Sequence, residues 1–537
     1  MMNLIRCKQI LKVGFLTTFL LFTVVLAKAQ TTIDENLRKL ATVMQIIHYA
    51  YVDTINESKL VENTIIQTLK ELDPHSYYIS KEDLDAANEP LIGSFEGIGI
   101  SFQIFNDTLM VIAPIIGGPS EKVGILAGDK IVEIDGDKSY GDKIDNQFVF
   151  DHLKGPKGTK VKVRIFRKGK TELIDFTITR DKIPMNSIDA TFMVDDEIGY
   201  IKLSRFAQTS HNEFKESIAL LKSKGMKKLI FDLRGNGGGV MQPAIEISDE
   251  FLKAGRLIVY TEGVNSPIEK YNATSGGSLE EEDLVLMIDE GSASSSEIVA
   301  GAIQDWDRGI VLGRRSFGKG LVQRPFQLPD GSAIRLTTAR YYTPTGRSIQ
   351  KPYENGTEKY YTDLYDRLRN GEFVHADSIH FPDSLKYYTP GKRMVYGGGG
   401  IMPDVFIPWD STIYSDYYID LVREGAFNDF ALKYVDENRI QFLAKYRNME
   451  TYVRDFNIDK KIFSEFLAFA DTKSSKKHNE DDLKTSEQMI KYVLKGLIGR
   501  NLFTMDAYFK VMTEIDDGFI KAVEVLKDKK IFAQIRK

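Results

Sequence analysis

The chain has 537 residues, a formal net charge of -5 at pH 7 and a hydrophobic fraction of 42%. This length exceeds what one hydrophobic core supports, so we expect several domains. Charges of both signs and a pI near 6.0 exclude the strongly basic field of nucleic-acid-binding proteins, so no nucleic-acid partner is expected. Cys7 is the single cysteine and lies in a segment that we expect to be removed, which leaves no disulfide or thiol chemistry.

Residues 1–29 have the pattern of an export signal. Three basic residues precede an apolar run over residues 13–26, and an A-x-A cleavage site ends at Ala29. The apolar run is shorter than the roughly 20 residues that a spanning helix needs. We therefore expect an exported, periplasmic protein. The alternatives are secretion and an uncleaved signal that holds the chain at the membrane.

Residues 30–93 are predicted to form an N-terminal helical region. Leu60, Ile65 and Leu69 follow roughly the spacing of one helix face. The region includes His75, which we interpret as structural because it lies beside a proline in a turn.

Residues 94–182 contain two glycine-rich stretches, at 95–102 and 124–136, and an alternating strand pattern at 160–166. Together they resemble a PDZ domain, which is rich in β-strands. The resemblance implies that Gly97, Ile98, Gly99 and Ile100 present backbone N–H groups to the terminal carboxylate of a peptide, which adds a strand to the sheet edge. The alternative is that the two glycines only permit a tight turn.

Residues 183–408 alternate between predicted strands and helices, which indicates an α/β core. Buried strands are predicted over residues 200–203, 228–233 and 284–288, and a hairpin turns at 328–331. A capping box, Ser210-x-x-Glu213, is predicted to open one of the helices. Residues 409–537 are charged, aromatic and helical in pattern, and no motif there points to chemistry.

Three stretches of the core carry candidate chemistry, at residues 232–239, 291–298 and 316–323. Ser294 follows a buried strand and starts a helical pattern, and Ser294-x-x-Glu297 also fits a simple capping box. Unpaired N–H groups at a helix start can hold an oxyanion, which makes the N–H of Ser295 a candidate donor. The glycines of the first stretch lack the G-K-[ST] ending of a phosphate-binding loop, so no nucleotide is expected.

Lys319 lies between two glycines. A lysine with its usual pKa of about 10.4 is charged at neutral pH and cannot act as a base. Burial lowers such a pKa by about 3 to 5 units, which is enough to make the amine neutral. The residues next to Lys319, taken alone, favour an alternative interpretation, which is a solvated lysine on a glycine loop.

The three stretches resemble the carboxyl-terminal processing, or tail-specific, serine protease family, and the resemblance covers about residues 35–408. It implies a multi-domain α/β protein with a ClpP/crotonase-like protease core, a PDZ domain, an N-terminal helical region and a helical C-terminal extension. It also implies that Ser294 is the nucleophile, Lys319 its base and Gln323 the group that orients the lysine amine.

The same resemblance extends to the oxyanion hole and to the substrates. Matching the family's glycine loop gives Gly239 as a donor beside Ser295, with Gly238 as the alternative. The implied substrates are proteins or peptides with apolar carboxyl termini, cut near those termini. No cofactor and no metal ion are implied, and assembly into a homo-oligomer is left open.

Two other functions remain open at this point. One is a hydrolase in which histidine replaces lysine as the base, although none of the seven histidines lies in the three stretches. The other is a non-catalytic protein that binds peptides or lipids on the same core. The presence of the serine, the lysine and the glycine loop favours the enzyme.

Overall fold

The computed structural model describes residues 34–532, apart from 106, 142–143, 476 and 529. The predicted export signal lies outside the described residues. The chain divides into two compact units, one up to Leu72 and one from Asp73 onward.

In the first unit, a helix over residues 34–50 precedes α2 (Glu57–Lys70). The side chain of Asn56 accepts a hydrogen bond from the N–H of Lys59 and so caps the start of α2. The prediction of helix is confirmed for this part of the chain. Of the residues on the predicted apolar face, Leu69 is buried.

The predicted PDZ region is a strand-rich domain with its own hydrophobic core. Its sheet has the order β3-β4-β5-β7-β8, with β6 paired to β5, so β3 is an edge strand. The elements are β3 (Ile100–Phe105), β4 (Thr108–Pro114), α4 (Pro119–Val123), β5 (Lys130–Ile134), β6 (Asp137–Lys138), α5 (Asn146–Leu153), β7 (Lys160–Phe166) and β8 (Ile174–Thr179). The strand predicted at 160–166 is confirmed.

A short antiparallel pair of strands flanks this domain. β2 (Ser94–Gly97) pairs with β9 (Asp181–Pro184), so the chain enters and leaves the domain at one place. The helix α3 (Leu84–Ile92) precedes β2 and ends at Gly93, whose φ of +78° suits a glycine.

The α/β core is built on a six-stranded sheet in the order β10-β11-β12-β15-β16-β21. The first two strands are antiparallel and the remaining neighbours are parallel. The strands are β10 (Ile188–Met193), β11 (Ile198–Leu203), β12 (Lys228–Asp232), β15 (Asp283–Ile288), β16 (Ile310–Gly313) and β21 (Val405–Phe406). The three buried strands expected from the sequence are therefore confirmed.

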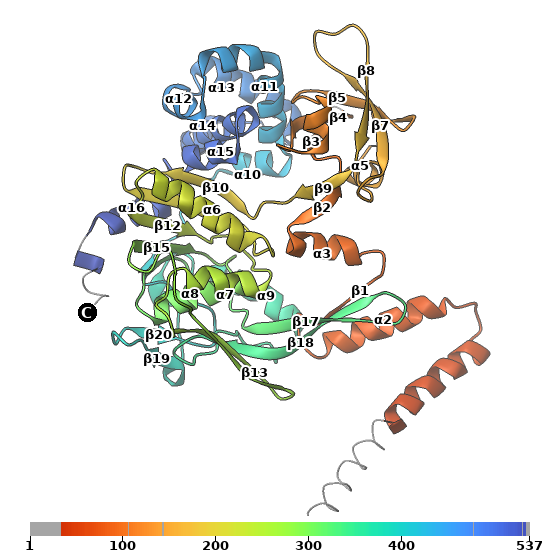
Figure 1. The fold of residues 1–537 in the computed structure, drawn as a ribbon, viewed down its shortest axis with the longest axis vertical. Coiled ribbons are helices and arrows are strands. Elements are labelled where there is room, and N and C mark those ends of the chain that lie inside the picture. The colour runs from red at the N-terminus through yellow and green to blue at the C-terminus, as the bar shows by residue number, and fades with distance from the viewer. Residues whose placement is uncertain (1–33, 106, 142–143, 476, 529, 533–537) are drawn as a thin grey trace, which may run out of the picture. The chain divides into compact units, whose positions relative to one another are not determined.

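Helices cover both faces of this sheet. On one face α6 (Ser210–Ser223), α7 (Met241–Asp249) and α8 (Ser295–Asp305) share the largest hydrophobic cluster with the strands. On the other face Phe519, Val525 and Leu526 of α16 (Asp517–Lys527) pack against strand residues. Figure 1 shows α16, near the blue end of the chain, beside β12 and β15. The core therefore includes a helix from the far C-terminal end.

The predicted capping box at Ser210 is wrong. The residue that caps α6 is Thr209, and the carboxylate of Glu213 accepts hydrogen bonds from the Thr209 hydroxyl (2.6 Å) and from the N–H of Ser187 (2.7 Å). The Ser210 hydroxyl instead accepts from the N–H of Ala207. Tertiary contacts with the neighbouring segments took the place of the local motif.

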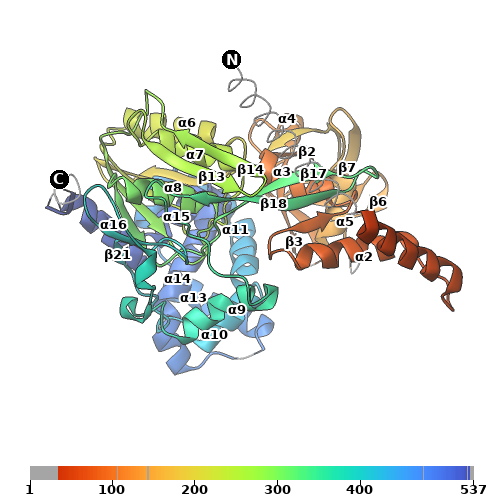
Figure 2. The same ribbon diagram turned by 90° about the horizontal axis from the view of Figure 1, so that it is seen from below.

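A second sheet lies beside the core, in the order β1-β18-β13-β14 with β17 also paired to β18. The strands are β1 (Tyr77–Ile79), β13 (Leu257–Gly263), β14 (Ser266–Asn272), β17 (Leu321–Gln327) and β18 (Ala333–Tyr342). Figure 2 shows β17 and β18 as a long hairpin in green, which confirms the hairpin predicted at 328–331. The prediction of helix up to residue 93 is wrong at β1, because this segment pairs with β18.

The rest of the chain is mainly helical. Residues after β18 form α9 (Thr357–Arg369), the short turns η1 (Ala376–Ser378) and η2 (Asp383–Leu385), and the hairpin β19 (Lys386–Tyr388) and β20 (Met394–Tyr396). The C-terminal extension has a hydrophobic core of its own. Its helices before α16 are α10 (Asp416–Arg423), α11 (Ala426–Lys445), α12 (Met449–Asp455), α13 (Lys460–Lys473), α14 (Glu480–Leu502) and α15 (Met505–Met512).

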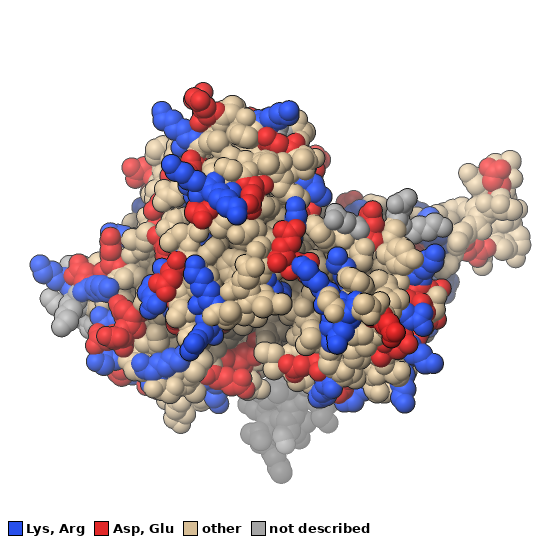
Figure 3. Space-filling view, turned by 90° about the horizontal axis from the view of Figure 1, so that it is seen from above, with Lys and Arg blue, Asp and Glu red and all other residues tan. Residues whose placement is uncertain are grey.

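The surface carries charges of both signs. On the face shown in Figure 3, Lys and Arg side chains are interspersed with Asp and Glu. Among the residues that the structure describes, no helix combines the length and the apolar character needed to cross a bilayer.

Candidate active site

Ser294 lies at the turn between β15 and α8, where it caps the first turn of the helix. Its φ is +55° and its ψ is -112°, a conformation that a residue with a side chain rarely adopts. Such strain persists only where the surroundings impose it, and it is concentrated at functional sites. The turn leaves Ser294 partly exposed while the next residues are buried.

The hydroxyls of the neighbouring serines are engaged with backbone carbonyls. Ser292 donates to Leu233 O (2.8 Å) and Ser296 donates to Asn236 O (2.8 Å). Ser295 lies 3.2 Å from the carbonyl oxygens of both Gly239 and Val240. These three serines therefore join the turn around Ser294 to the glycine loop.

The glycine loop after β12 is held by the side chain of Asn236. Its Nδ2 donates to Leu203 O (2.9 Å), and its Oδ1 accepts from the N–H of Gly238 (2.9 Å). Its backbone oxygen accepts from the N–H of Ala293 (3.0 Å), next to Ser294. One buried asparagine thus fixes the loop relative to both the sheet and Ser294.

Gly239 occupies a position that requires glycine. Its φ is +145°, and a Cβ there would lie 2.1 Å from Phe206 O. Phe206 bonds to Gly238 O and to the N–H of Val240, which is the pattern of a parallel bridge. In that pattern the N–H of Gly239 itself points away from Phe206.

The carboxylate of Glu297 connects the turn around Ser294 to the loop that carries Lys319. It is fully buried. Its Oε2 accepts from the N–H of Ser294 (2.8 Å) and of Lys319 (2.9 Å), and its Oε1 accepts from the N–H of Gly318 (2.7 Å) and from the Ser316 hydroxyl. Burial nevertheless raises the pKa of Glu297 above its usual value, against these four donors.

Tyr341 gives a second connection between the two segments. Its hydroxyl lies 3.1 Å from Ser294 O and 2.9 Å from Lys319 O, so one proton is shared between two backbone carbonyls. No sequence motif pointed to Tyr341.

Lys319 lies in a partly buried loop just before β17. Burial lowers its pKa from the usual lysine value, and the Arg335 guanidinium acts in the same direction. The carboxylates of Glu297 and Asp73 oppose this by raising the pKa. The net direction is towards a neutral amine, which is the condition for a lysine base.

Gln323 faces the same region from β17. A bulge interrupts the pairing of β17 with β18 between Val322 and Gln323, so Gln323 lies opposite Thr337. Its Nε2 is 3.3 Å from the Thr337 hydroxyl oxygen. The segment from Lys319 to Gln323 is therefore not a straight strand, because the β-bulge interrupts it just before Gln323.

One cavity of about 490 Å³ brings the candidate residues together. Ser294, Ser295, Lys319, Gln323 and Gly239 all line it. The remaining walls come from the following residues: Tyr77, Asn88, Leu91, Gly237, Gly238, Val240, Met241, Ile298, Leu321, Val322, Pro325, Arg335 and Tyr341. Of the described residues that line it, none is a histidine. His75 instead lies 2.8 Å from the Tyr360 hydroxyl, and burial, followed by the Lys319 charge, lowers the pKa of His75 to about 4.

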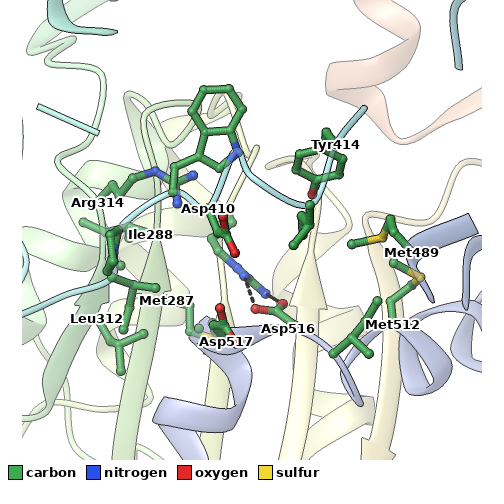
Figure 4. Close-up of a pocket in the computed structure, with 18 residues that line it drawn as sticks. Met287, Ile288, Leu312, Arg314, Asp410, Tyr414, Met489, Met512, Asp516 and Asp517 are labelled. Carbon is green, nitrogen blue, oxygen red and sulfur yellow. Dashed lines mark hydrogen bonds and ion pairs between the residues drawn. The ribbon is translucent and has the colours of Figure 1, made fainter. Parts of the chain in front are cut away.

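The C-terminal extension contacts the glycine loop on its other side. The Arg234 guanidinium donates to both carboxylate oxygens of Asp516, at 3.0 and 2.7 Å, and also to Asp232. Figure 4 shows this ion pair at the edge of a second cavity, of about 310 Å³, between the sheet and the C-terminal helices. Burial raises the pKa of Asp232, but the charges of Arg234 and Lys202 outweigh burial and bring this pKa below its usual value. No sequence motif had marked Asp516.

The predicted peptide-binding loop lies between β2 and β3. The carbonyl of Ile98 accepts hydrogen bonds from the N–H and the hydroxyl of Ser120, and the carbonyl of Gly99 accepts from the N–H of Ile115. Gly99 has a φ of +74°. Gly97 ends β2 and Ile100 begins β3, the edge strand of the sheet.

In the part of the chain that the structure describes, no three His, Cys, Asp or Glu side chains are grouped closely enough to hold a metal ion.

A partly exposed serine in a strained strand-to-helix turn meets a glycine loop and a partly buried lysine at one cavity, an arrangement suited to a serine peptidase. The model of peptidase family S41 matches residues 197–359, a PDZ domain model matches 97–178, and a family of unknown function matches 417–504.

The chain is similar to the carboxy-terminal-processing protease of Bartonella bacilliformis, with 36% identity over 336 residues that cover 61% of this chain and 76% of the relative. It is also 34% identical to the carboxy-terminal processing protease CtpA of Bacillus subtilis, over 60% of this chain and 69% of the relative. The chain belongs to peptidase family S41, among the carboxy-terminal processing proteases, and is a serine-type peptidase with a PDZ domain.

Among solved structures, the photosystem II D1 C-terminal processing protease is 25% identical, with a TM-score of 0.35, over 68% of this chain and 92% of that one.

Proposed function

We propose that this protein is an endopeptidase that cuts proteins or peptides near their carboxyl termini, with Ser294 as nucleophile and Lys319 as base. The observation that carries the proposal is the shared cavity, where groups from the glycine loop, the start of α8 and the segment around β17 meet. The lowered pKa of Lys319 supports its role as a base, because a neutral amine can accept a proton.

The proposed reaction has two stages. The Lys319 amine takes the hydroxyl proton of Ser294 as its Oγ attacks the peptide carbonyl carbon, and the resulting ammonium gives that proton to the leaving amine. Water then attacks the acyl-enzyme, with Lys319 again as base, and releases the carboxylate product. Gln323 orients the Lys319 amine throughout.

Two backbone amides are proposed to hold the oxyanion, those of Gly239 and Ser295. The N–H of Gly238 already donates to Asn236, whereas the N–H of Gly239 points away from its bridge partner, and this supports Gly239 over Gly238. Ser295 is the first residue of α8, where N–H groups lack partners within the helix.

The PDZ domain is proposed to recognise the substrate's apolar carboxyl terminus at Gly97, Ile98, Gly99 and Ile100. β3 is an edge strand, so its outer side can pair with an added strand. Amidation of the terminal carboxylate of a tailed peptide should then raise KM and leave kcat nearly unchanged. Equal KM values for the free acid and the amide would contradict this role.

We further propose that the protein is exported. Cleavage after Ala29 makes Gln30 the first residue of the mature chain, which N-terminal sequencing of the protein from its native compartment checks.

The central test uses Ser294→Ala and Lys319→Ala in the purified full chain. Each should lower kcat/KM on a tailed peptide by at least about 1,000-fold, as for other catalytic serines and their bases. A fluorophosphonate should label the parent and Ser295→Ala, which keeps the backbone N–H, but not Ser294→Ala. Turnover retained in Lys319→Ala, or labelling lost only in Ser295→Ala, would overturn the assignment.

A further inference from the structure

We propose that Asp73 is a positioning residue for the catalytic base, acting through Thr337 on the side-chain amide of Gln323. The proposal rests on the function proposed above, since it concerns how Lys319 is oriented.

Asp73 lies in a buried turn that several hydrogen bonds define. Only 7% of its surface is exposed. Its Oδ1 accepts from the N–H of His75 (2.8 Å) and of Ser76 (3.0 Å), and its Oδ2 accepts from the Ser76 hydroxyl (2.6 Å). These hydrogen bonds within the turn therefore hold the carboxylate in one orientation, independently of its contact with the proposed active site.

Asp73 is joined to the site by Thr337 in β18. The Thr337 hydroxyl donates to Asp73 Oδ1 (3.0 Å), while the Thr337 N–H donates to the hydroxyl of Ser76 (3.1 Å). The pairing of β1 with β18 brings these segments together. The bulge in β17 then places Gln323 directly opposite Thr337.

The direction of these hydrogen bonds is what gives Asp73 its role. An ionised carboxylate only accepts, so the Thr337 hydroxyl must donate to it and has only its lone pairs left for Gln323. The amide of Gln323 therefore turns its Nε2 towards Thr337, as the 3.3 Å contact requires. Its Oε1 remains as an acceptor for an N–H of the Lys319 amine, which would direct the amine's lone pair towards Ser294. An aspartate that sets a histidine's tautomer in other serine proteases acts by the same logic.

Asp73 also acts on Lys319 through its charge, and this effect is separable. The charged groups that face Lys319 are Glu297 from α8, Arg335 from β18 and Asp73. The charge of Lys319 in turn lowers the pKa of His75. The carboxylate of Asp73 raises the pKa of Lys319. Removing the charge of Asp73 should lower the pKa of Lys319 further, whereas removing the Thr337 hydroxyl should leave the pKa of Lys319 unchanged.

The test compares Thr337→Val with Asp73→Asn in the full chain, using pH profiles of kcat and kcat/KM. Thr337→Val keeps the size and the backbone N–H, and should lower kcat by up to about 100-fold with little change in KM, because misorientation by about 1 Å has effects of that size. The acidic limb of its profile should not move. Thr337→Ser should restore most of the activity.

Asp73→Asn should lower kcat as well, and in addition should shift the acidic limb to lower pH. A limb that stays in place would contradict the effect of charge. A role in folding alone would lower the thermal midpoint without moving the limb.

A double-mutant cycle separates this inference from a general loss of structure. If Thr337 acts through Gln323, then Thr337→Val should have almost no further effect on kcat in a Gln323→Ala background. Additive effects would overturn the inference even where each variant is partly destabilised. If Ser294→Ala and Lys319→Ala abolish turnover while Thr337→Val stays within about twofold of the parent, this inference fails and the proposed function stands.

Discussion

The proposed nucleophile, Ser294, and the proposed base, Lys319, are supported in different ways. Ser294 is positioned by residues that lie close to it, at the ends of the adjacent parallel strands β12 and β15 and at the start of α8. The pKa of Lys319 depends on charges from remote segments, including Asp73, which raises it, and Arg335, which lowers it. The strained turn at Ser294 is therefore set mainly by segments next to it in the sheet, whereas the lowered pKa of Lys319 depends on the whole assembled core.

Glu297 binds both the turn that carries Ser294 and the loop that carries Lys319, so its replacement should have the largest effect. In Glu297→Gln, one carboxylate oxygen becomes an NH₂ group that faces two donors. Each hydrogen bond to a charged group contributes about 1.5–3 kcal/mol, and we expect the free energy of unfolding to fall by about 3 kcal/mol or more. Loss of the negative charge also removes a group that raises the pKa of Lys319, so the acidic limb of kcat/KM should shift to lower pH.

Glu213→Gln is the matched control, because that carboxylate also accepts from backbone and hydroxyl donors but lies away from the cavity. Chemical denaturation and pH profiles should show a stability loss in both variants and a displaced limb only in Glu297→Gln. If kcat/KM of Glu297→Gln changed no more than that of the control, the link between the two sides would be refuted.

The same contrast explains what the sequence could predict. Buried strands and the hairpin at 328–331 follow from local periodicity and turn residues, so their positions were predicted well. Ser294, Lys319 and the glycine loop were found from local motifs, and their catalytic roles stay predictions. Asp73 and Tyr341 were not found, because Asp73 meets Thr337 only through the pairing of β1 with β18, and Tyr341 meets the carbonyls of Ser294 and Lys319 only in the folded core.

A medium effect is expected on the nucleophile side from Gly239→Ala. The added Cβ would meet Phe206 O at 2.1 Å in a backbone conformation with φ of +145°, so the loop must move. Loss of one oxyanion donor lowers the stabilisation of the transition state by about 2.7–4 kcal/mol, which predicts a fall in kcat with little change in KM.

Gly235→Ala is its control in the same loop, with φ of +67° and no atom within 4 Å of the added Cβ. It should cost about 1–2 kcal/mol of stability from the left-handed conformation alone. Steady-state kinetics and denaturation of both variants separate the two effects. Equal values of kcat would remove Gly239 from the oxyanion hole.

The smallest effect should come from Asp516→Asn, at the contact between the C-terminal extension and Arg234. Asn keeps the ability to cap α16, where Asp516 accepts from the N–H of Phe519 (3.1 Å), but loses the charge that binds Arg234. Both partners are about a quarter exposed, so screening limits the pair to about 1 kcal/mol. Arg234 retains Asp232, and we expect kcat/KM to fall only a few-fold.

Salt gives the sharper measurement for this pair. The difference in free energy of unfolding between the parent and Asp516→Asn should shrink as ionic strength rises, because a partly exposed ion pair is screened. Asp517→Asn, one residue further along, controls for the charge at the start of α16. A difference that is equally large at low and high salt would mean that Asp516 supports the glycine loop through packing and not through its charge.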